Sequence, residues 1–451
     1  MAPKDFHVLI AGAGIAGLSL GVMLKKAGIQ FTILEKASEL KPLGSGLFLT
    51  AQVLRVYDQV GVLEDLEAVS VASHGGTYYF QNSETMADVD MSYYSTTFGY
   101  ATRHVARADF VNVLMAHLPE GCIHFGKKIL NTMQRAENGV MVRCADGSSY
   151  TGDILVGADG AYSAVRQSMY KNLALKGQPV PPADTAPLRL ESFSILGVTK
   201  PLENEPVLYE STAKLRCLMG TREKPYIVTL LPIGKGRLAW FIRGKLLEAE
   251  FHDQESFRFT EWDNDTIHDI VKDLEHLPLV LGGTVGNLIK NTDKISRVML
   301  EDKWFTTWYE GRTVLVGDAC HKTLPAAGQG AVQSILDCVC LANLLHELPT
   351  NEASDIERVF AKFFEIRGAT TAKVVATSKT ISGLTSGSSW FHTFIRPFVI
   401  RLVSTPFFHS ILNKSLAGRP VLNYMPKPEL KGVPDPSPAH TLGLVPDAVA
   451  A

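Results

Sequence analysis

The sequence predicts an α/β protein in which a parallel sheet packs between helices and a second, mixed sheet forms a separate region. Three observations predict this class. The chain has 451 residues, which exceeds the length at which a single core usually stops growing and favours two domains. Three apolar runs typical of buried parallel strands each end in a glycine-containing turn that precedes a helical pattern. Apolar residues make up 46% and charged residues 20%, an ordinary globular balance.

Charge and cysteine content narrow the possible functions. The formal net charge is −2, so there is no basic surplus for nucleic acid. None of the six cysteines forms a CxxC pair or a His/Cys cluster with zinc spacing, so we expect no metal site. Unpaired cysteines indicate a reducing compartment, and the first residues lack the pattern of a signal peptide. We therefore expect a cytoplasmic protein.

The first apolar run, Phe6–Ala11, leads into a glycine-rich turn. Gly12, Gly14 and Gly17 have the GxGxxG spacing of a Rossmann-like dinucleotide-binding fold. The first glycine permits the tight bend, the second lets the backbone approach a pyrophosphate, and the third lets the helix lie close to the strand. The phosphates then meet free N–H groups at the positive end of the helix.

The second strand, Gln30–Leu34, ends at Glu35. A carboxylate at this position can accept both ribose hydroxyls of an adenosine and argues against a 2′-phosphate. Strand, turn, helix, strand and acid together predict dinucleotide binding. They do not separate NAD from FAD.

A second motif lies in Asp153–Arg166, where the strand Ile154–Val156 leads to Asp159 and then to a helix. Asp159 either contributes to the nucleotide site or only caps that helix. A third motif lies in Gly311–Asp337.

In the third motif the strand Thr313–Val316 ends in Gly317-Asp318, and Gly328–Gly330 opens a helix. Asp318 is suited to bind a ribityl hydroxyl. The N–H groups from Gly328 onward are suited to a pyrimidine carbonyl or a developing anion.

These motifs, in this order and spacing, resemble the single-component (group A) FAD-dependent aromatic hydroxylases and monooxygenases. That family includes salicylate hydroxylase, kynurenine 3-monooxygenase and a fungal branch that tailors polyketides and terpenoids. The resemblance runs from roughly Asp5 to Pro426 and includes the glycine-containing loop in Pro42–Leu66 and the helix start Arg107–Phe110. The chain departs from the family pattern at Ala51-Gln52, Val332 and Leu336-Asp337.

The resemblance implies an FAD cofactor, NAD(P)H as co-substrate, and O2. NAD(P)H would reduce FAD, oxygen would add at the flavin C4a, and the hydroperoxide would hydroxylate or epoxidise a hydrophobic aromatic, polyketide or terpenoid molecule. A reductase or dehydrogenase on the same scaffold, or a redox-sensing flavoprotein without turnover, stays open. Motifs and resemblance together give these cofactor-binding candidates: Gly12, Gly14, Gly17, Glu35, Lys36, Gly46, Arg107, Asp159, Asp318, Gly328, Gly330 and Ala331.

Three residues are candidates for catalysis. Pro325 is expected in the loop beside the isoalloxazine. Tyr226 matches a family strand whose tyrosine orients a substrate hydroxyl or relays a proton, although a core tyrosine is the alternative. Arg216 is suited to pair a substrate carboxylate or phenolate, unless it is an ordinary solvated arginine. Trp240 is either core or pocket wall, and His321 is expected to make a structural hydrogen bond.

The resemblance also implies a discontinuous FAD-binding domain, formed by residues 1–176 and 296–385. Residues of about 70–100 are expected to contribute to the substrate domain, an α+β region with a mixed sheet that covers residues 177–295. Residues 386–432 form a C-terminal helical and aromatic segment, and residues 433–451 are expected to be a disordered tail.

The stretch Trp390–Leu412 is aromatic and basic, and it reaches the ~20 residues that a membrane span needs. Its arginines and prolines argue against a simple span. Two interpretations stay open: helices that pack over the substrate pocket, or an interfacial contact with a membrane.

Overall fold

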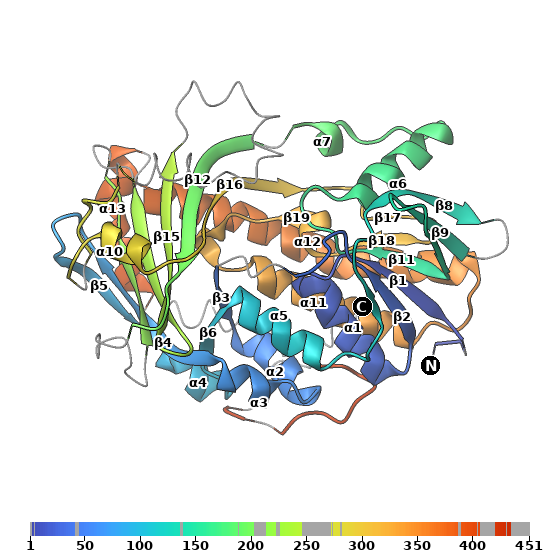
Figure 1. Cartoon of the computed structure of the whole chain (residues 1–451), viewed down its shortest axis with the longest axis horizontal. Helices are drawn as coiled ribbons and strands as arrows, with labels where there is room; N and C mark the ends of the chain where they lie inside the picture. The colour runs from blue at the N-terminus through green and yellow to red at the C-terminus, as the bar shows by residue number, and fades with distance from the viewer. Residues whose placement is uncertain are drawn as a thin grey trace, which may run out of the picture.

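The structure is a computed structural model with two large sheets bridged by a long helix (Figure 1). It describes residues 2–3, 5–40, 45–135, 139–187, 189–202, 213–221, 226–245, 272, 274–279, 282–386, 389–403, 405, 420–429 and 431–433. Residues 434–451 of the predicted tail (433–451), residues 246–271, and residues 406–412 of the aromatic stretch lie outside this part of the chain.

A six-stranded sheet carries the nucleotide-binding motifs. Its order is β17-β18-β11-β1-β2-β7, and all neighbours are parallel except β17 and β18. The apolar runs form its centre because helices cover both faces of a parallel sheet. The strands are β1 (His7–Ala11), β2 (Gln30–Leu34), β7 (Ile123–His124), β11 (Ile154–Gly157), β17 (Tyr309–Glu310) and β18 (Thr313–Leu315).

The second large sheet has ten strands in the order β19-β16-β12-β15-β14-β13-β4-β6-β3, with β5 paired to β4. Residues 70–100 do enter this sheet, as expected, through β4 and β5. The strands are β3 (Gly46–Leu49), β4 (Ser70–Tyr79), β5 (Thr85–Asp90), β6 (Thr102–Ala106), β12 (Arg189–Val198), β13 (Ala213–Leu218), β14 (Ile227–Ile233), β15 (Arg237–Lys245), β16 (Ile295–Trp304) and β19 (His321–Lys322). β16 lies in this sheet although the predicted boundary assigns it to the FAD-binding domain. The division into domains stays a prediction.

A three-stranded antiparallel sheet and several shorter helices complete the described fold. The sheet consists of β8 (Ile129–Arg135), β9 (Gly139–Cys144) and β10 (Ser149–Gly152). The shorter helices are α2 (Ala51–Gln59), α3 (Leu63–Ala68), α4 (Ser92–Phe98), α5 (Arg107–Ala116), α6 (Ala164–Leu175), α7 (Pro182–Thr185) and α10 (Val285–Lys290).

Two helices behind the nucleotide-binding motifs organise the core. α11 (Gly330–His346) is buried from Val332 to Leu345 and packs against α1 (Ile15–Ala27). The 34-residue α12 (Ala353–Ser386) runs from the six-stranded sheet to the ten-stranded one (Figure 1). α13 (Trp390–Leu402) then packs against the end of α12 and against β5.

The two faces of the ten-stranded sheet bury different clusters. One face, with Trp240 and Leu230, packs with the helix α10. The other face carries Leu231 and Ala239, which pack with Phe48 and Phe241. We call this second face the inner face. Gly46, the first residue of β3, lies against it, since a Cβ on Gly46 would be 2.6 Å from Leu231 and 2.7 Å from Ala239. The start of β3 therefore meets the inner face.

Candidate functional site

The glycine-rich turn between β1 and α1 contains two tightly packed glycines, Gly12 and Gly17, and one, Gly14, that faces open space. Gly12 has φ +101°, and a Cβ there would lie 2.6 Å from the carbonyl oxygen of Ala158. A Cβ on Gly17 would collide with the carbonyl of Gly12. A Cβ on Gly14 would meet no atom within 4 Å, although Gly14 is the residue that caps α1. The space beside Gly14 fits a pyrophosphate at the positive end of the helix.

The carboxylate of Glu35 is locked beside this turn. It accepts hydrogen bonds from the backbone N–H of Ala13 at 2.7 Å and of Ala37 at 2.9 Å. Glu35 is buried at the end of β2, whereas the neighbouring Lys36 is exposed. Each carboxylate oxygen keeps a lone pair for a further donor such as a ribose hydroxyl.

Arg107 and Asp318 complete a charged group around the same space. Arg107 begins α5, and its backbone N–H donates to Ser45 at 2.8 Å, which ties α5 to the loop before β3. Burial lowers the pKa of Arg107, while attraction to Glu35 and Asp318 partly restores it. Burial also raises the pKa of Asp318, against the charges of Lys322, His321 and Arg107.

Within the described residues, neither the Asp318 carboxylate nor the Arg107 guanidinium has a hydrogen-bond partner on the protein. Both side chains are half-buried, and partial removal of a charged group from water costs free energy unless a ligand supplies partners. An FAD with its ribityl hydroxyls and phosphates supplies such partners. The residues present therefore fit this cofactor.

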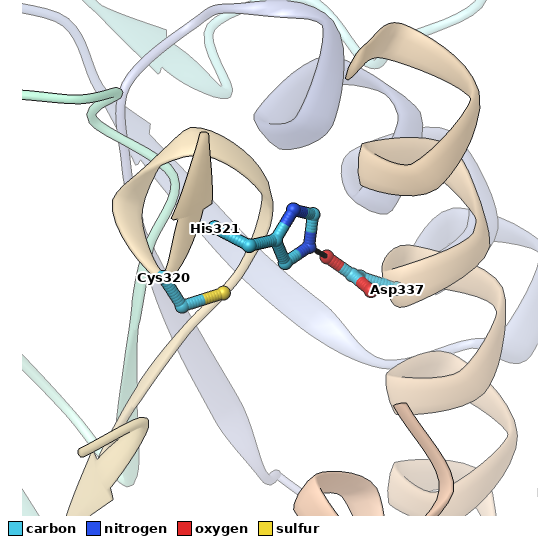
Figure 2. A group of neighbouring side chains, drawn as sticks. All are labelled: Cys320, His321 and Asp337. Carbon is cyan, nitrogen blue, oxygen red and sulfur yellow. Dashed lines mark hydrogen bonds and ion pairs between the residues drawn. The ribbon is translucent and has the colours of Figure 1, made fainter. Parts of the chain in front are cut away.

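A buried ion-pair network holds the turn that carries Asp318 (Figure 2). That turn is the short helix η3 (Gly317–Ala319). The Asp337 carboxylate accepts from the Gly317 N–H at 3.0 Å, from Arg367 Nε at 2.7 Å, and bonds His321 Nε2 at 2.6 Å. Figure 2 shows the His321 ring directed at Asp337 on α11. His321 thus makes the structural hydrogen bond that the sequence analysis expected.

Cys320, His321 and Asp337 also have the donor atoms of a metal site, all within 4.8 Å of one another. Their surroundings disfavour a cation. Both oxygens of Asp337 are already engaged, and the Arg367 guanidinium, 2% exposed, supplies a positive charge. A second cation would be repelled, so we assign this cluster to holding the turn.

The motif that contains Asp159 also supports the turn Gly317–Ala319, through Arg166. Arg166 donates to the carbonyl of Ala319 at 2.6 Å and to that of Ala161 at 2.7 Å, and it lies 3.9 Å above the ring centre of Phe305. One oxygen of Asp159 caps α6 by accepting from the Val165 N–H at 3.1 Å. Its other oxygen is buried without a partner among the described residues, and burial raises the pKa of Asp159. The cap alternative therefore holds for one oxygen, and the other stays available for a ligand.

The loop after this turn connects the charged group to the inner face. It contains the short helix η4 (Pro325–Ala327), then Gly328 with φ +62°, and α11 begins at Gly330. The N-cap residue of α11, Gln329, makes no side-chain cap, so the first N–H groups of α11, including that of Ala331, lack a side-chain acceptor there. A Cβ on Gly328 would lie 3.5 Å from Phe48, which packs against the inner-face cluster. The loop with Pro325, Gly328 and Gly330 therefore lies close to the inner face.

Tyr226 and Arg216 lie away from this place. Arg216 pairs with Leu230, which pairs with Trp240, so all three share the face opposite the inner face. Tyr226 packs at the edge of the same cluster with Trp240. Trp240 is wholly buried and donates to Thr292, so it is a core residue. The catalytic roles of Tyr226 and Arg216 stay predictions that their positions do not support.

The sequence analysis missed Arg367 and the structural part played by Asp337. Asp337 carried a weak signal, since it matched one half of a family dipeptide. Arg367 carried none, because its contact with Asp337 depends on how α12 packs on α11.

Comparisons with known proteins agree with this geometry. A family model described as an FAD binding domain matches residues 5–376. The FAD-dependent monooxygenase ptmM of Penicillium ochrochloron is 30% identical over 437 residues, which cover 94% of this chain and 99% of the relative. The FAD-dependent monooxygenase atmM of Aspergillus flavus is 28% identical over 444 residues, covering 96% and 89%.

Solved structures share the fold. HpxO of Klebsiella pneumoniae, solved with FAD and uric acid, has a TM-score of 0.71 at 22% identity and covers 91% of this chain and 95% of its own. A salicylate hydroxylase substrate complex has a TM-score of 0.65 at 20% identity, covering 94% and 99%. The chain thus belongs to the FAD-binding domain family of flavoproteins, and it is an FAD-dependent monooxygenase.

Proposed function

We propose that this monooxygenase uses NAD(P)H and O2 to hydroxylate or epoxidise a hydrophobic small molecule of the aromatic, polyketide or terpenoid class. The observation that carries the proposal is the apolar inner face beside the cofactor loops. Phe48, Leu231, Ala239 and Phe241 form one cluster there, and a Cβ on Gly328 would lie 3.5 Å from the Phe48 ring. Apolar walls with few polar groups are typical of sites for apolar ligands.

In this proposal each group of residues has a separate task. FAD, when bound, supplies the redox chemistry with NAD(P)H and O2. Gly14 and the positive end of α1 bind its pyrophosphate, Glu35 binds the adenosine ribose, and Asp318 with Arg107 holds the ribityl and phosphate region. Pro325, Gly328 and Gly330 orient the reactive ring toward the inner face. The unsatisfied N–H groups at the start of α11 stabilise negative charge there.

The apolar cluster also excludes water. Water lets reactive oxygen be lost as hydrogen peroxide instead of reaching the substrate. Leu231 and Ala239 are wholly buried, and Phe48 and Phe241 are partly buried against them. We expect a bound apolar substrate to complete this shield.

Oxygen-18 labelling tests the proposal. The purified flavoprotein receives NADPH or NADH, 18O2 and a panel of aromatic and terpenoid compounds, and products are analysed by mass spectrometry. We expect one labelled oxygen atom in the product of at least one compound. Cofactor oxidation that yields only labelled hydrogen peroxide or water with every compound would instead support a reductase or a redox sensor.

We propose, too, a reducing cytoplasmic location and a contact with a membrane surface through α13. All six cysteines are free thiols, which supports the first part. Among the described residues no helix is both long enough and apolar enough to cross a bilayer. The proposed contact is therefore at the surface.

A further inference from the structure

The helix α13 presents an unusual outer face. Along it, large apolar side chains are exposed at intervals of three or four residues, which places them on one side of the helix. Their exposed fractions are Trp390 77%, Phe391 51%, Phe394 65%, Phe398 60%, Val399 37% and Leu402 48%. A row of exposed aromatic residues of this kind marks an interaction surface rather than an ordinary solvent face.

The inner side of α13 is firmly attached, so the exposure of its outer side is not a sign of a loose helix. Arg396, 1% exposed, donates to the carbonyls of Gly220 at 2.9 Å and Thr385 at 3.0 Å. Ile400 packs into a cluster with Cys217 and Ile227 of the inner face. One side of α13 thus covers the sheet and the other faces outward, and both interpretations of this stretch stay predictions.

The charge of the sequence around α13 indicates which kind of partner this exposed face binds. Between Glu365 and Glu429 the chain contains no aspartate or glutamate. The same stretch contains eight basic residues, although the whole chain carries a net charge of −2. They are Arg367, Lys373, Lys379, Arg396, Arg401, Lys414, Arg419 and Lys427. Of these, Arg401 on α13 and Lys373 and Lys379 on α12 are exposed in the structure, whereas the exposed Lys427 lies beside α2, where Gln59 donates to the carbonyl of Pro426.

We infer that α13 lies flat in the headgroup region of an anionic phospholipid bilayer, with its aromatic side inserted. An aromatic side next to basic residues is the combination that binds such a surface, because the rings enter the interface and the cations meet lipid phosphates and carboxylates. Since Ile400 of the same helix packs on the inner face, α13 stands between the bilayer and the substrate region. An apolar substrate dissolved in the bilayer then reaches the enzyme at this surface. This last step rests on the proposed oxygenation of such a substrate, whereas lipid binding deepens the membrane contact proposed above and does not depend on the reaction.

Vesicle sedimentation tests the inference with the full-length flavoprotein. Vesicles contain phosphatidylcholine alone or with about a third phosphatidylserine. We expect the protein to sediment with the anionic vesicles and to be released as salt is raised. The triple variant Phe391→Ser/Phe394→Ser/Phe398→Ser should bind at least about tenfold more weakly. The matched control Leu175→Ser removes a side chain that is 87% exposed at the end of α6 and should bind like wild type.

Trp390 supplies a second readout that loss of folding would not mimic. Vesicles should shift its emission to the blue, brominated lipids should quench it, and Trp390→Phe should abolish both effects. Of the other four tryptophans, Trp240 and Trp308 are buried, Trp304 is partly buried against the core, and Trp262 lies outside the described residues. Comparison with Trp390→Phe therefore identifies the source of the change. Flavin content and circular dichroism of each variant confirm that it is folded.

Three results would overturn the inference: a wild-type protein that never sediments with lipid, a triple variant that sediments like wild type, or a Trp390 signal that vesicles leave unchanged. Equal binding to neutral vesicles would overturn the anionic part. A dimer that the triple variant converts to a monomer, with no lipid binding, would assign this surface to a second copy of the chain. Lipid binding without labelled product would leave the inference standing and refute only the proposed function.

Discussion

Replacing Asp337 by Asn tests whether the buried network holds the turn that carries Asp318. The substitution keeps the size of the side chain and removes its charge. Arg367, 2% exposed, then loses its only carboxylate partner among the described residues and keeps only Gln333. Breaking a buried ion pair from one side typically costs about 3–5 kcal/mol. Because Asn retains one acceptor, we expect about 3 kcal/mol of lost stability.

Urea unfolding measures this loss. Trp308 reports locally, since its ring lies 5.4 Å from that of His321, and circular dichroism reports globally. The matched control is Glu365→Gln, which removes an exposed partner of Lys362 and should cost at most about 0.5 kcal/mol. The Gly317 N–H also loses a charged acceptor, so FAD should bind about twofold to tenfold more weakly. A change below about 0.5 kcal/mol in Asp337→Asn would refute the role of the network.

The dependence of stability on pH provides a second test of the Asp337 network. Burial alone would raise the pKa of Asp337, but His321 and Arg367 outweigh burial and hold it below its ordinary value of 3.8. A depressed carboxyl pKa stabilises the folded state above the unfolded pKa and loses that effect as pH falls through the folded pKa. The stability difference between wild type and Asp337→Asn should therefore be full near neutrality and shrink only below pH 3.8. A difference that grows on acidification contradicts this assignment.

Three further predictions concern single residues. Gly14→Ala should fold normally and lose FAD affinity, because its Cβ enters the space assigned to the pyrophosphate. Gly17→Ala should fail to fold, because its Cβ collides with Gly12. Equal solubility and flavin content of the two variants would contradict the assignment. Burial lowers the pKa of His104 to about 3. Wild type should therefore lose about 2 kcal/mol of stability between pH 7 and pH 5, whereas His104→Phe should not. Urea unfolding that shows the same loss of stability in both proteins would contradict this prediction. Tyr226→Phe should keep the ratio of product to oxidised NAD(P)H, since Tyr226 packs with Trp240 away from the inner face, and a collapse of that ratio would restore its predicted catalytic role.

Local patterns were sufficient to predict the glycine turns, strands and acids that the structure brings together at the candidate nucleotide-binding site. The predicted strand Gln30–Leu34 matches β2, because apolar and β-branched residues there are followed directly by an acid. Glu35 and Asp318 lie beside Arg107, as expected from the order of motifs. These residues could be found because each stands at a fixed distance from a glycine turn.

Features that depend on how helices and strands pack together could not be predicted from the sequence. Side chains alternate between the faces of a strand, so a strand pattern cannot tell which face meets the cofactor. Tyr226 and Arg216 lie on the face opposite the inner face, and their catalytic roles stay predictions. The partner of Asp337 lies 30 residues away on another helix. The two sides of α13 were visible only once Arg396 and Ile400 were located in the core.

Titration of the apoprotein with FAD tests the central claim most directly, namely that three separated turns bind one flavin nucleotide. Wild type should bind one equivalent, as should Asp293→Ala, a control at an acid that is 71% exposed. Asp318→Ala should bind about tenfold to a hundredfold more weakly with unchanged circular dichroism, since a half-buried charged acceptor is lost. A wild-type protein that stays colourless, or an Asp318→Ala variant that binds FAD as tightly as wild type, would contradict the claim.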